Sequence, residues 1–128
     1  MINIPVSVGE VIDKLSILQV KKTKLSNPEK LIYVEKEFEI LYNLSSEFLN
    51  DTNIESIYHQ LVKVNSELWD IEDNLRIFEK KGVFDNEFLQ LARNVYFTND
   101  KRFELKNEIN HLTSSEIIEV KEYVSYKN

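Results

Sequence analysis

Glycine and proline, the residues that most often interrupt regular structure, are rare in this chain. Its 128 residues contain two glycines and two prolines. A many-stranded sheet needs many turns built from these residues, so the sequence favours long helices. Apolar residues make up 42% of the chain, which excludes a disordered protein, and the length suffices for a core without cross-links. We therefore predict one domain over residues 1–128.

Capping signals divide the chain into four helical segments. Ser7 stands three residues before Glu10, and Thr52 three residues before Glu55, which is the spacing of a capping box. The pair Asn27-Pro28 places a good N-cap before a proline at the first helical position, where proline costs nothing. With helical periodicity between these signals, the expected helices cover residues 8–25, 28–49, 53–81 and 84–113.

The connections and the two ends complete the predicted fold. Gly82 suits the left-handed position that closes a helix, and the short loop after it predicts antiparallel packing of the third and fourth segments. Residues 117–126 favour an extended strand, with a short helix as the alternative, and are expected to cross the bundle or pair with residues 2–6. The predicted fold class is all-α: an antiparallel bundle of four main helices with short extended N- and C-terminal segments.

The fourth helical segment carries an unusual inward stripe. The stripe begins apolar and then becomes polar at Asn99, Arg102 and Lys106, before apolar character returns at Ile109. A helix that buries its first turns normally keeps its stripe apolar to the end. Since unpaired burial of such groups is costly, the polar part must meet a partner charge, a ligand or water.

Two polar residues on the third segment, Asn65 and Glu72, are placed to approach that stripe if the segments lie antiparallel. One interpretation is a buried ion-pair network that fixes the register of the helices. The other is a polar pocket inside the bundle, where Arg102 binds a carboxylate or phosphate with its planar fork and Lys106 adds a point charge. The two interpretations are compatible.

The candidate ligand-binding set follows from this stripe and its neighbours: Glu10, Lys14, Asn65, Glu72, Arg76, Asn99, Asp100, Arg102 and Lys106. Glu72 or Asp100 could serve as a base if there is chemistry, but the sequence assigns no catalytic residue and no cofactor. No metal site is assigned either, because His59 and His111 lack further ligands at metal-site spacing and are expected on the surface.

An acidic run at residues 67–73 offers one alternative. Glu67 and Asp70 have the Glu-x-x-Asp spacing that resembles half of the magnesium site in all-α nucleoside-triphosphate pyrophosphohydrolases. That family needs a second motif on an earlier helix, and the glutamates at positions 35, 37 and 39 have the wrong spacing. A solvated acidic face is the competing interpretation.

Charge and targeting signals limit partners and location. The formal net charge of −6 argues against a nucleic-acid binder, which would carry a basic face. The chain has no cysteine, its first residues lack a signal peptide, and no apolar run reaches the length of a membrane span. We therefore expect a cytoplasmic protein.

Several blocks in order resemble a bacterial and phage family of small proteins known only as a domain of unknown function. The blocks are residues 7–14, 68–73, 99–102 with Lys106 and 109–110, and the tail around Glu119, Lys121 and Tyr123. The resemblance implies a setting in cell-surface polysaccharide synthesis, since such proteins are often encoded near glycosyltransferases. It implies no catalytic residues.

Three functions remain open at this level. The first is a non-enzymatic accessory module that binds an anionic small molecule or a partner protein. The second is a hydrolase or transferase for a nucleotide or sugar phosphate, with Glu72 and Asp100 holding magnesium and Arg102 and Lys106 on phosphate. The third is a structural bundle that self-associates as a homo-oligomer.

Overall fold

The computed structural model describes residues 1–127 and contains four α-helices, with no strand among these residues. The helices are α1 (Val8–Lys24), α2 (Pro28–Leu49), α3 (Thr52–Lys81) and α4 (Asn86–Leu112). The predicted all-α fold with extended ends is therefore confirmed. The last residue of the predicted domain, Asn128, lies outside the described residues. No helix within the described range is long and apolar enough to cross a membrane.

Local capping explains the helix boundaries. The Ser7 hydroxyl accepts a hydrogen bond from the Glu10 N–H at 3.1 Å, as the capping box predicts. Gly82 closes α3 in the left-handed region, with φ at 67°. The third start was predicted one residue late, because Asp51 is the N-cap in place of Thr52. The Asp51 carboxylate accepts hydrogen bonds from the backbone N–H groups of Asn53 and Ile54. A carboxylate also suits the positive end of the helix dipole.

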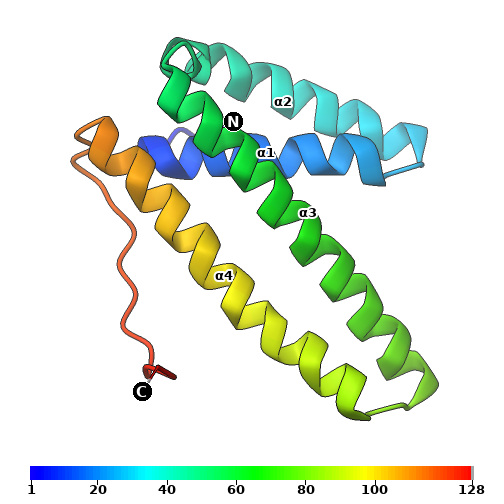
Figure 1. The fold of residues 1–128 in the computed structure, drawn as a ribbon. Helices are drawn as coiled ribbons and strands as arrows, with labels where there is room; N and C mark the ends of the chain where they lie inside the picture. The colour runs from blue at the N-terminus through cyan, green and yellow to red at the C-terminus, as the bar shows by residue number, and fades with distance from the viewer. Residues whose placement is uncertain (128) are drawn as a thin grey trace.

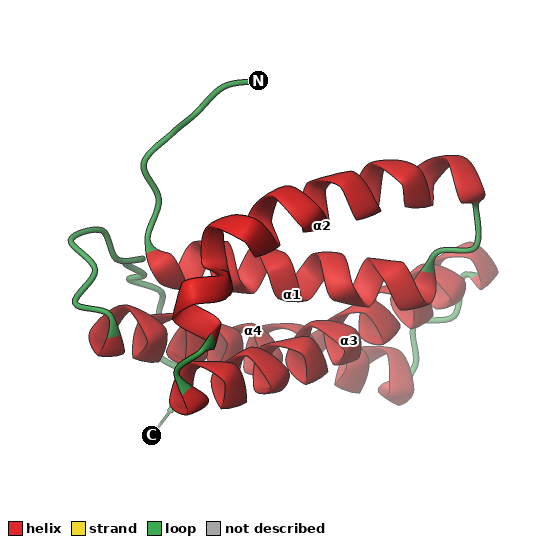
Figure 2. Ribbon diagram, turned by 90° about the horizontal axis from the view of Figure 1, so that it is seen from above, coloured by secondary structure: helices red, strands yellow, loops and turns green. Residues whose placement is uncertain are grey.

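The helices form layers, and α1 is the middle one. Figure 2 shows α2 on one side of α1 and the α3–α4 hairpin on the other. In Figure 1, α1 crosses the first half of α3 and the last half of α4 obliquely. The buried core lies at this crossing, where Ile12 of α1 meets Ile57, Leu61 and Ile109. Because α1 is covered from both sides, most of its circumference must be compatible with burial.

The far half of the α3–α4 hairpin extends beyond α1 (Figure 1). Apolar residues of the helical repeat of α3 there, including Ile71 and Leu75, are only half-buried since no third helix covers them. Phe88 holds the hairpin end together through edge-on contacts with Phe78 and Phe84, at ring-centroid distances of 6.3 and 5.1 Å. The core therefore occupies one end of the hairpin rather than its whole length.

The C-terminal segment after α4 turns back and runs beside that helix as an extended chain (Figure 1). The extended conformation agrees with the β-rich composition of the segment, but the predicted pairing with residues 2–6 is wrong. Residues 1–6 lie instead over α1 and α2, where they line a pocket with Val11 and Tyr33. The two extended ends thus belong to different sides of the molecule.

Gly9 marks the closest approach of α1 to α4 and gives a testable prediction. A Cβ atom at this position would lie 2.3 Å from the Lys106 carbonyl oxygen, which is backbone and has little freedom to move. We expect Gly9→Ala to lower the free energy of unfolding by about 2 kcal/mol through overpacking, although alanine is the better helix former. Urea unfolding measures this. Gly82→Asn, which keeps a residue tolerant of the left-handed region, is the control and should change little.

Candidate functional site

The centre of the site is an ion pair between α1 and α4. The guanidinium of Arg102 donates from Nε to Asp13 Oδ1 at 2.9 Å and from Nη2 to Asp13 Oδ2 at 2.6 Å. The Asp13 side chain is 1% exposed and the Arg102 side chain 28% exposed. This bidentate geometry is the strongest form of such a pair, and the hydrogen bond to Asp13 raises the pKa of Arg102.

A third helix completes the surroundings of Asp13. The Asn65 amide of α3 donates to Asp13 Oδ1 at 3.1 Å and to the Ser16 hydroxyl at 2.8 Å. Ser16 in turn donates to the Asp13 carbonyl oxygen at 2.5 Å. The buried carboxylate therefore has partners from α3 and from α4, which is the condition under which a buried charge is tolerated.

Lys106 forms a second ion-pair centre one helical turn further along α4. Its ammonium lies 2.9 Å from Glu10 Oε2 on α1 and 2.5 Å from Glu119 Oε2 on the C-terminal segment, and its side chain is 7% exposed. Burial lowers the pKa of Lys106, but the hydrogen bonds to Glu119 and Glu10 outweigh burial and the net shift is upward. Lys106 is therefore a buried cation shared by two carboxylates.

An open pocket of about 290 Å³ adjoins the Asp13–Arg102 pair on the side of α3. The polar residues and the indole that line it are Asn65, Trp69, Glu72, Asp73, Arg76 and Arg102. Arg76 and Glu72 form an exposed pair at 2.9 Å across one turn of α3. The Nη1 atom of Arg102 makes no hydrogen bond within the described range, and Arg102 is one of the residues that line this pocket.

The structure distributes the nine predicted site residues over several places. Four of them belong to the buried network, that is, to the contacts around Asp13 and Lys106: Arg102, Lys106, Asn65 and Glu10. The expected approach of Glu72 to Arg102 and Lys106 is wrong as a direct pairing, since Glu72 pairs with Arg76 and shares only the pocket wall with Arg102. The error arises because the polar stripe of α4 faces α1, while a different face of α4, including Leu105, meets α3.

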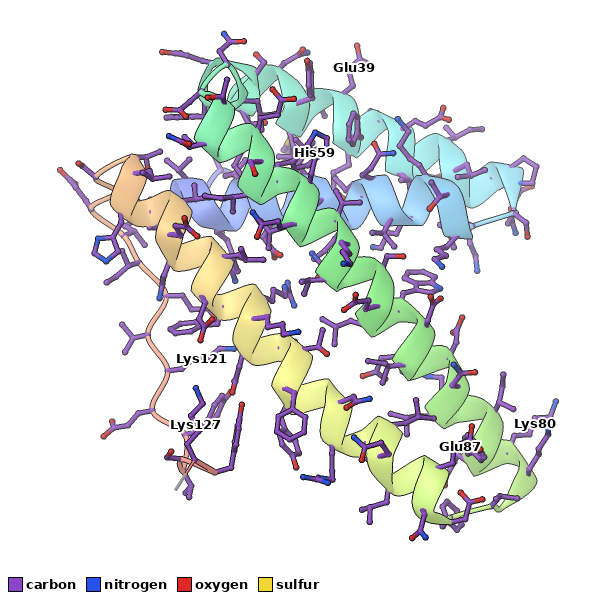
Figure 3. All side chains as sticks on the ribbon, in the orientation of Figure 1. Glu39, His59, Lys80, Glu87, Lys121 and Lys127 are labelled. Atoms are coloured by element: carbon purple, nitrogen blue, oxygen red, sulfur yellow. The ribbon has the colours of Figure 1, made fainter. Side chains whose placement is uncertain are left out.

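The remaining predicted residues lie apart from the network. Lys14 points to the α2 side, where it pairs with Glu37 at 3.4 Å. Asp100 accepts a hydrogen bond from the Tyr126 hydroxyl of the C-terminal segment. Asn99 is half-buried and makes no side-chain hydrogen bond in the part of the chain described. Both histidines are exposed, as expected of surface residues; His59 is labelled on α3 in Figure 3.

Sequence reasoning missed three members of the network: Asp13, Ser16 and Glu119. A signal for the first two was present, because Gly9, Asp13 and Ser16 follow one another at intervals of four and three residues. That spacing puts a small and polar stripe on one face of α1, beside the apolar stripe of Ile12 and Leu15. Helical spacing gives no comparable signal for Glu119, which the sequence singles out only through the family resemblance, because the path of the extended segment determines its partner.

Carboxylates do not gather as the magnesium hypothesis requires. Glu72 lines the pocket beside Arg102, whereas Asp100 lines a separate pocket under the C-terminal segment. Among residues 1–127 no group of three or more histidine, aspartate or glutamate side chains is placed to hold a metal ion.

Fold and site together define a small all-α protein built around a buried charge network. The chain belongs to DUF6165, a family of unknown function whose model matches residues 2–127. This confirms the resemblance to a domain of unknown function over nearly the whole chain. Searches of curated proteins and of solved structures gave no match.

The buried pair gives a second prediction. Asp13→Asn keeps the shape of the side chain but removes the charge opposite Arg102, so we expect a loss of about 3 kcal/mol in the free energy of unfolding. The matched control is Asp70→Asn, because Asp70 pairs with Lys24 at 2.8 Å but is 59% exposed. The control should cost less than about 1 kcal/mol in the same denaturant titration. Equal losses would contradict a special role for the buried pair.

Tyr126 gives a third prediction, about pH. The hydrogen bond to Asp100 raises the pKa of Tyr126 to about 12. Since the pKa in the folded state lies above the ordinary value of 10.0, the bond is complete below pH 10 and is lost as the pH rises through 12. NMR titration of the Tyr126 ring should show this late transition. Asp100→Asn should shift the transition to lower pH, and Glu122→Gln, which removes an exposed carboxylate outside this contact, should not.

Proposed function

We propose that this protein is a non-enzymatic accessory module that binds an anionic small molecule in the pocket between α1, α3 and α4. The observation that carries the proposal is the geometry of Arg102. Asp13 holds one edge of its guanidinium, formed by Nε and Nη2, while Nη1 makes no hydrogen bond among the described residues and Arg102 lines the pocket. A guanidinium fixed in this way binds a carboxylate or phosphate with little loss of side-chain entropy.

The other pocket residues fit the same role. Arg76 supplies a second guanidinium, and an incoming anion would replace Glu72 as its partner because that pair is exposed and weak. Trp69 and Leu68 add an apolar wall for the body of the ligand. Glu72 and Asp73 keep the pocket from being strongly basic, which favours a ligand that carries hydroxyl groups beside its anionic group.

The ligand class follows from this chemistry together with the family resemblance. The resemblance implies a setting in cell-surface carbohydrate synthesis, where sugar phosphates and nucleotide sugars combine an anionic group with many hydroxyls. A cytoplasmic location would be consistent with such ligands. We therefore assign the pocket to a sugar phosphate or nucleotide sugar, bound without chemical change.

One observation favours a second candidate function, self-association as a structural module. The outer face of α2 exposes Ile32, Tyr33 and Leu44, and α2 buries only Val34 and Ser45. Large exposed apolar patches of this kind mark interaction surfaces. Light scattering distinguishes the two functions, because a structural homo-oligomer would form without any ligand.

A ligand panel tests the binding function. Inorganic phosphate, glucose 1-phosphate and UDP-glucose are added separately to the full chain while the melting temperature is followed. A ligand at about 100 times its Kd stabilises the folded state by about 2.7 kcal/mol, so the melting temperature should rise by several degrees. Arg76→Ala should remove most of the rise, since Arg76 is exposed and its loss leaves the fold intact.

Lys80→Ala is the matched control: it removes a positive charge from the same helix, near the hairpin end where Figure 3 labels it, and Lys80 does not line the pocket. The control should keep the ligand-induced rise. The absence of a rise with all three ligands would rule out the binding function. Release of UMP or UDP from UDP-glucose, or of inorganic phosphate from glucose 1-phosphate, in the presence of Mg²⁺ would instead establish the hydrolase.

A further inference from the structure

The C-terminal segment 116–127 is held against α4 by side chains rather than by its backbone. No backbone hydrogen bond joins this segment to α4 within the described residues. Its carboxylates, amines and hydroxyls provide the attachment instead. The segment therefore meets the helix in the way that a bound extended peptide meets its receptor.

Three anchors attach the segment, and their partners follow one another along a single stripe of α4. Glu119 pairs with Lys106 at 2.5 Å, and the Lys121 ammonium lies 5.1 Å from the centroid of the Phe103 ring. The third anchor joins Tyr126 to Asp100. The partners are spaced by three residues, so they form one face of α4, and the segment runs antiparallel to the helix. Figure 3 shows Lys121 between the segment and α4.

The aliphatic side chains of the segment contribute little to its attachment. Ile118, Val120 and Val124 are 56%, 80% and 95% exposed, so little of their surface is buried. The side chains that contact α4 are the carboxylate of Glu119, the ammonium of Lys121 and the phenol of Tyr126, and each has a complementary partner on the helix. Charge and aromatic chemistry therefore determine which sequence fits the stripe.

Lys106 gives the stripe its preference for a carboxylate. Its ammonium lies between Glu10 of α1 and Glu119 of the segment, so departure of the segment removes one of its two counter-charges. A carboxylate from another molecule would restore it. The segment is connected to α4 through residues 113–116, where Ser114 adopts a positive φ of 51°, a conformation that most side chains avoid.

We propose that the α4 stripe formed by Lys106, Phe103 and Asp100 is a docking site for an extended acidic peptide segment of a partner protein, which residues 116–127 occupy within the same chain. The matching peptide carries a carboxylate, a basic residue two positions later and a tyrosine five positions after that. A partner with this pattern displaces the segment and takes over its three contacts. The segment thereby regulates access to the stripe.

This docking site is independent of the pocket assigned above to an anionic small molecule. The pocket lies beside Arg102 on the α3 side, whereas the stripe lies under the C-terminal segment and contains none of the pocket residues. Ligand binding in the pocket and peptide binding to the stripe are measured with different probes. Either one can therefore fail without affecting the other.

A labelled peptide with the sequence of residues 116–127 tests the proposal by fluorescence anisotropy. The receptor is the full chain carrying Glu119→Gln and Tyr126→Phe, which weaken the internal segment but leave the four helices unchanged. We expect the peptide to bind this variant more tightly than the unaltered chain, because the tethered segment of the latter competes at a high effective concentration.

Peptide variants provide the specificity control without altering the folded protein. The peptide with Glu119→Gln should bind at least about tenfold more weakly, since it loses a charge-assisted bond to a buried cation. The peptide with Glu122→Gln has the same net charge and alters only an exposed side chain, so its binding should be unchanged. Equal binding of these two peptides, or no binding to the weakened chain, would overturn the proposal.

Discussion

The ion pair between Asp13 and Arg102 is the interaction on which the arrangement of three helices depends. Asp13 lies on the middle helix of the structure, at a position covered from both sides, and an unpaired carboxylate there would cost several kcal/mol. The hydrogen bonds of this carboxylate form only when Arg102 of α4 and Asn65 of α3 both lie beside Asp13. A shift of either helix by one turn would break these contacts. The pair therefore selects one register among the many that apolar packing alone would permit.

The same requirement explains the close approach of α1 and α4. Gly9 allows the backbones of α1 and α4 to touch. Its N–H donates to the Asn110 side chain at 2.7 Å, so the seam, which is the line of contact between α1 and α4, also has a polar contact at this end. Along the seam, Asn110, Lys106 and Arg102 meet Gly9, Glu10 and Asp13 in turn. The buried charges thus fix the register of α1 against α4. Apolar contacts such as those of Ile12 and Ile109 are interchangeable and would not fix it.

Functional potential arises where this network meets the surface. Asp13 fixes one edge of Arg102, which also lines the pocket beside α3, while Lys106 pairs with Glu119 of the C-terminal segment. Both cations are oriented by contacts that serve the fold. The proposed binding of an anionic group therefore depends on side chains that also stabilise the helix arrangement.

Much of the local structure was predictable, because its causes lie within a few residues. The Ser7 capping box and the Gly82 cap specify helix ends through contacts that the chain makes with itself. Asp51 shows the limit of such reasoning: two neighbouring residues can both act as N-cap, and the sequence pattern favours the wrong one. Similarly, the apolar periodicity of α3 is uniform, yet Leu61 is fully buried and Leu75 is not. The length of the neighbouring helices, rather than the pattern, determines where the core ends.

By itself the sequence determined four helices, their approximate ends, and the fact that Arg102 and Lys106 in the polar stripe of α4 must meet a partner. Only the tertiary structure decided that this partner is α1 with the C-terminal segment, rather than Glu72 of α3. The physical reason is that periodicity defines the faces of a helix but not the neighbour that each face meets. That choice depends on how the two helical hairpins cross, and the crossing is set by Gly9, Asp13 and the surrounding core acting together.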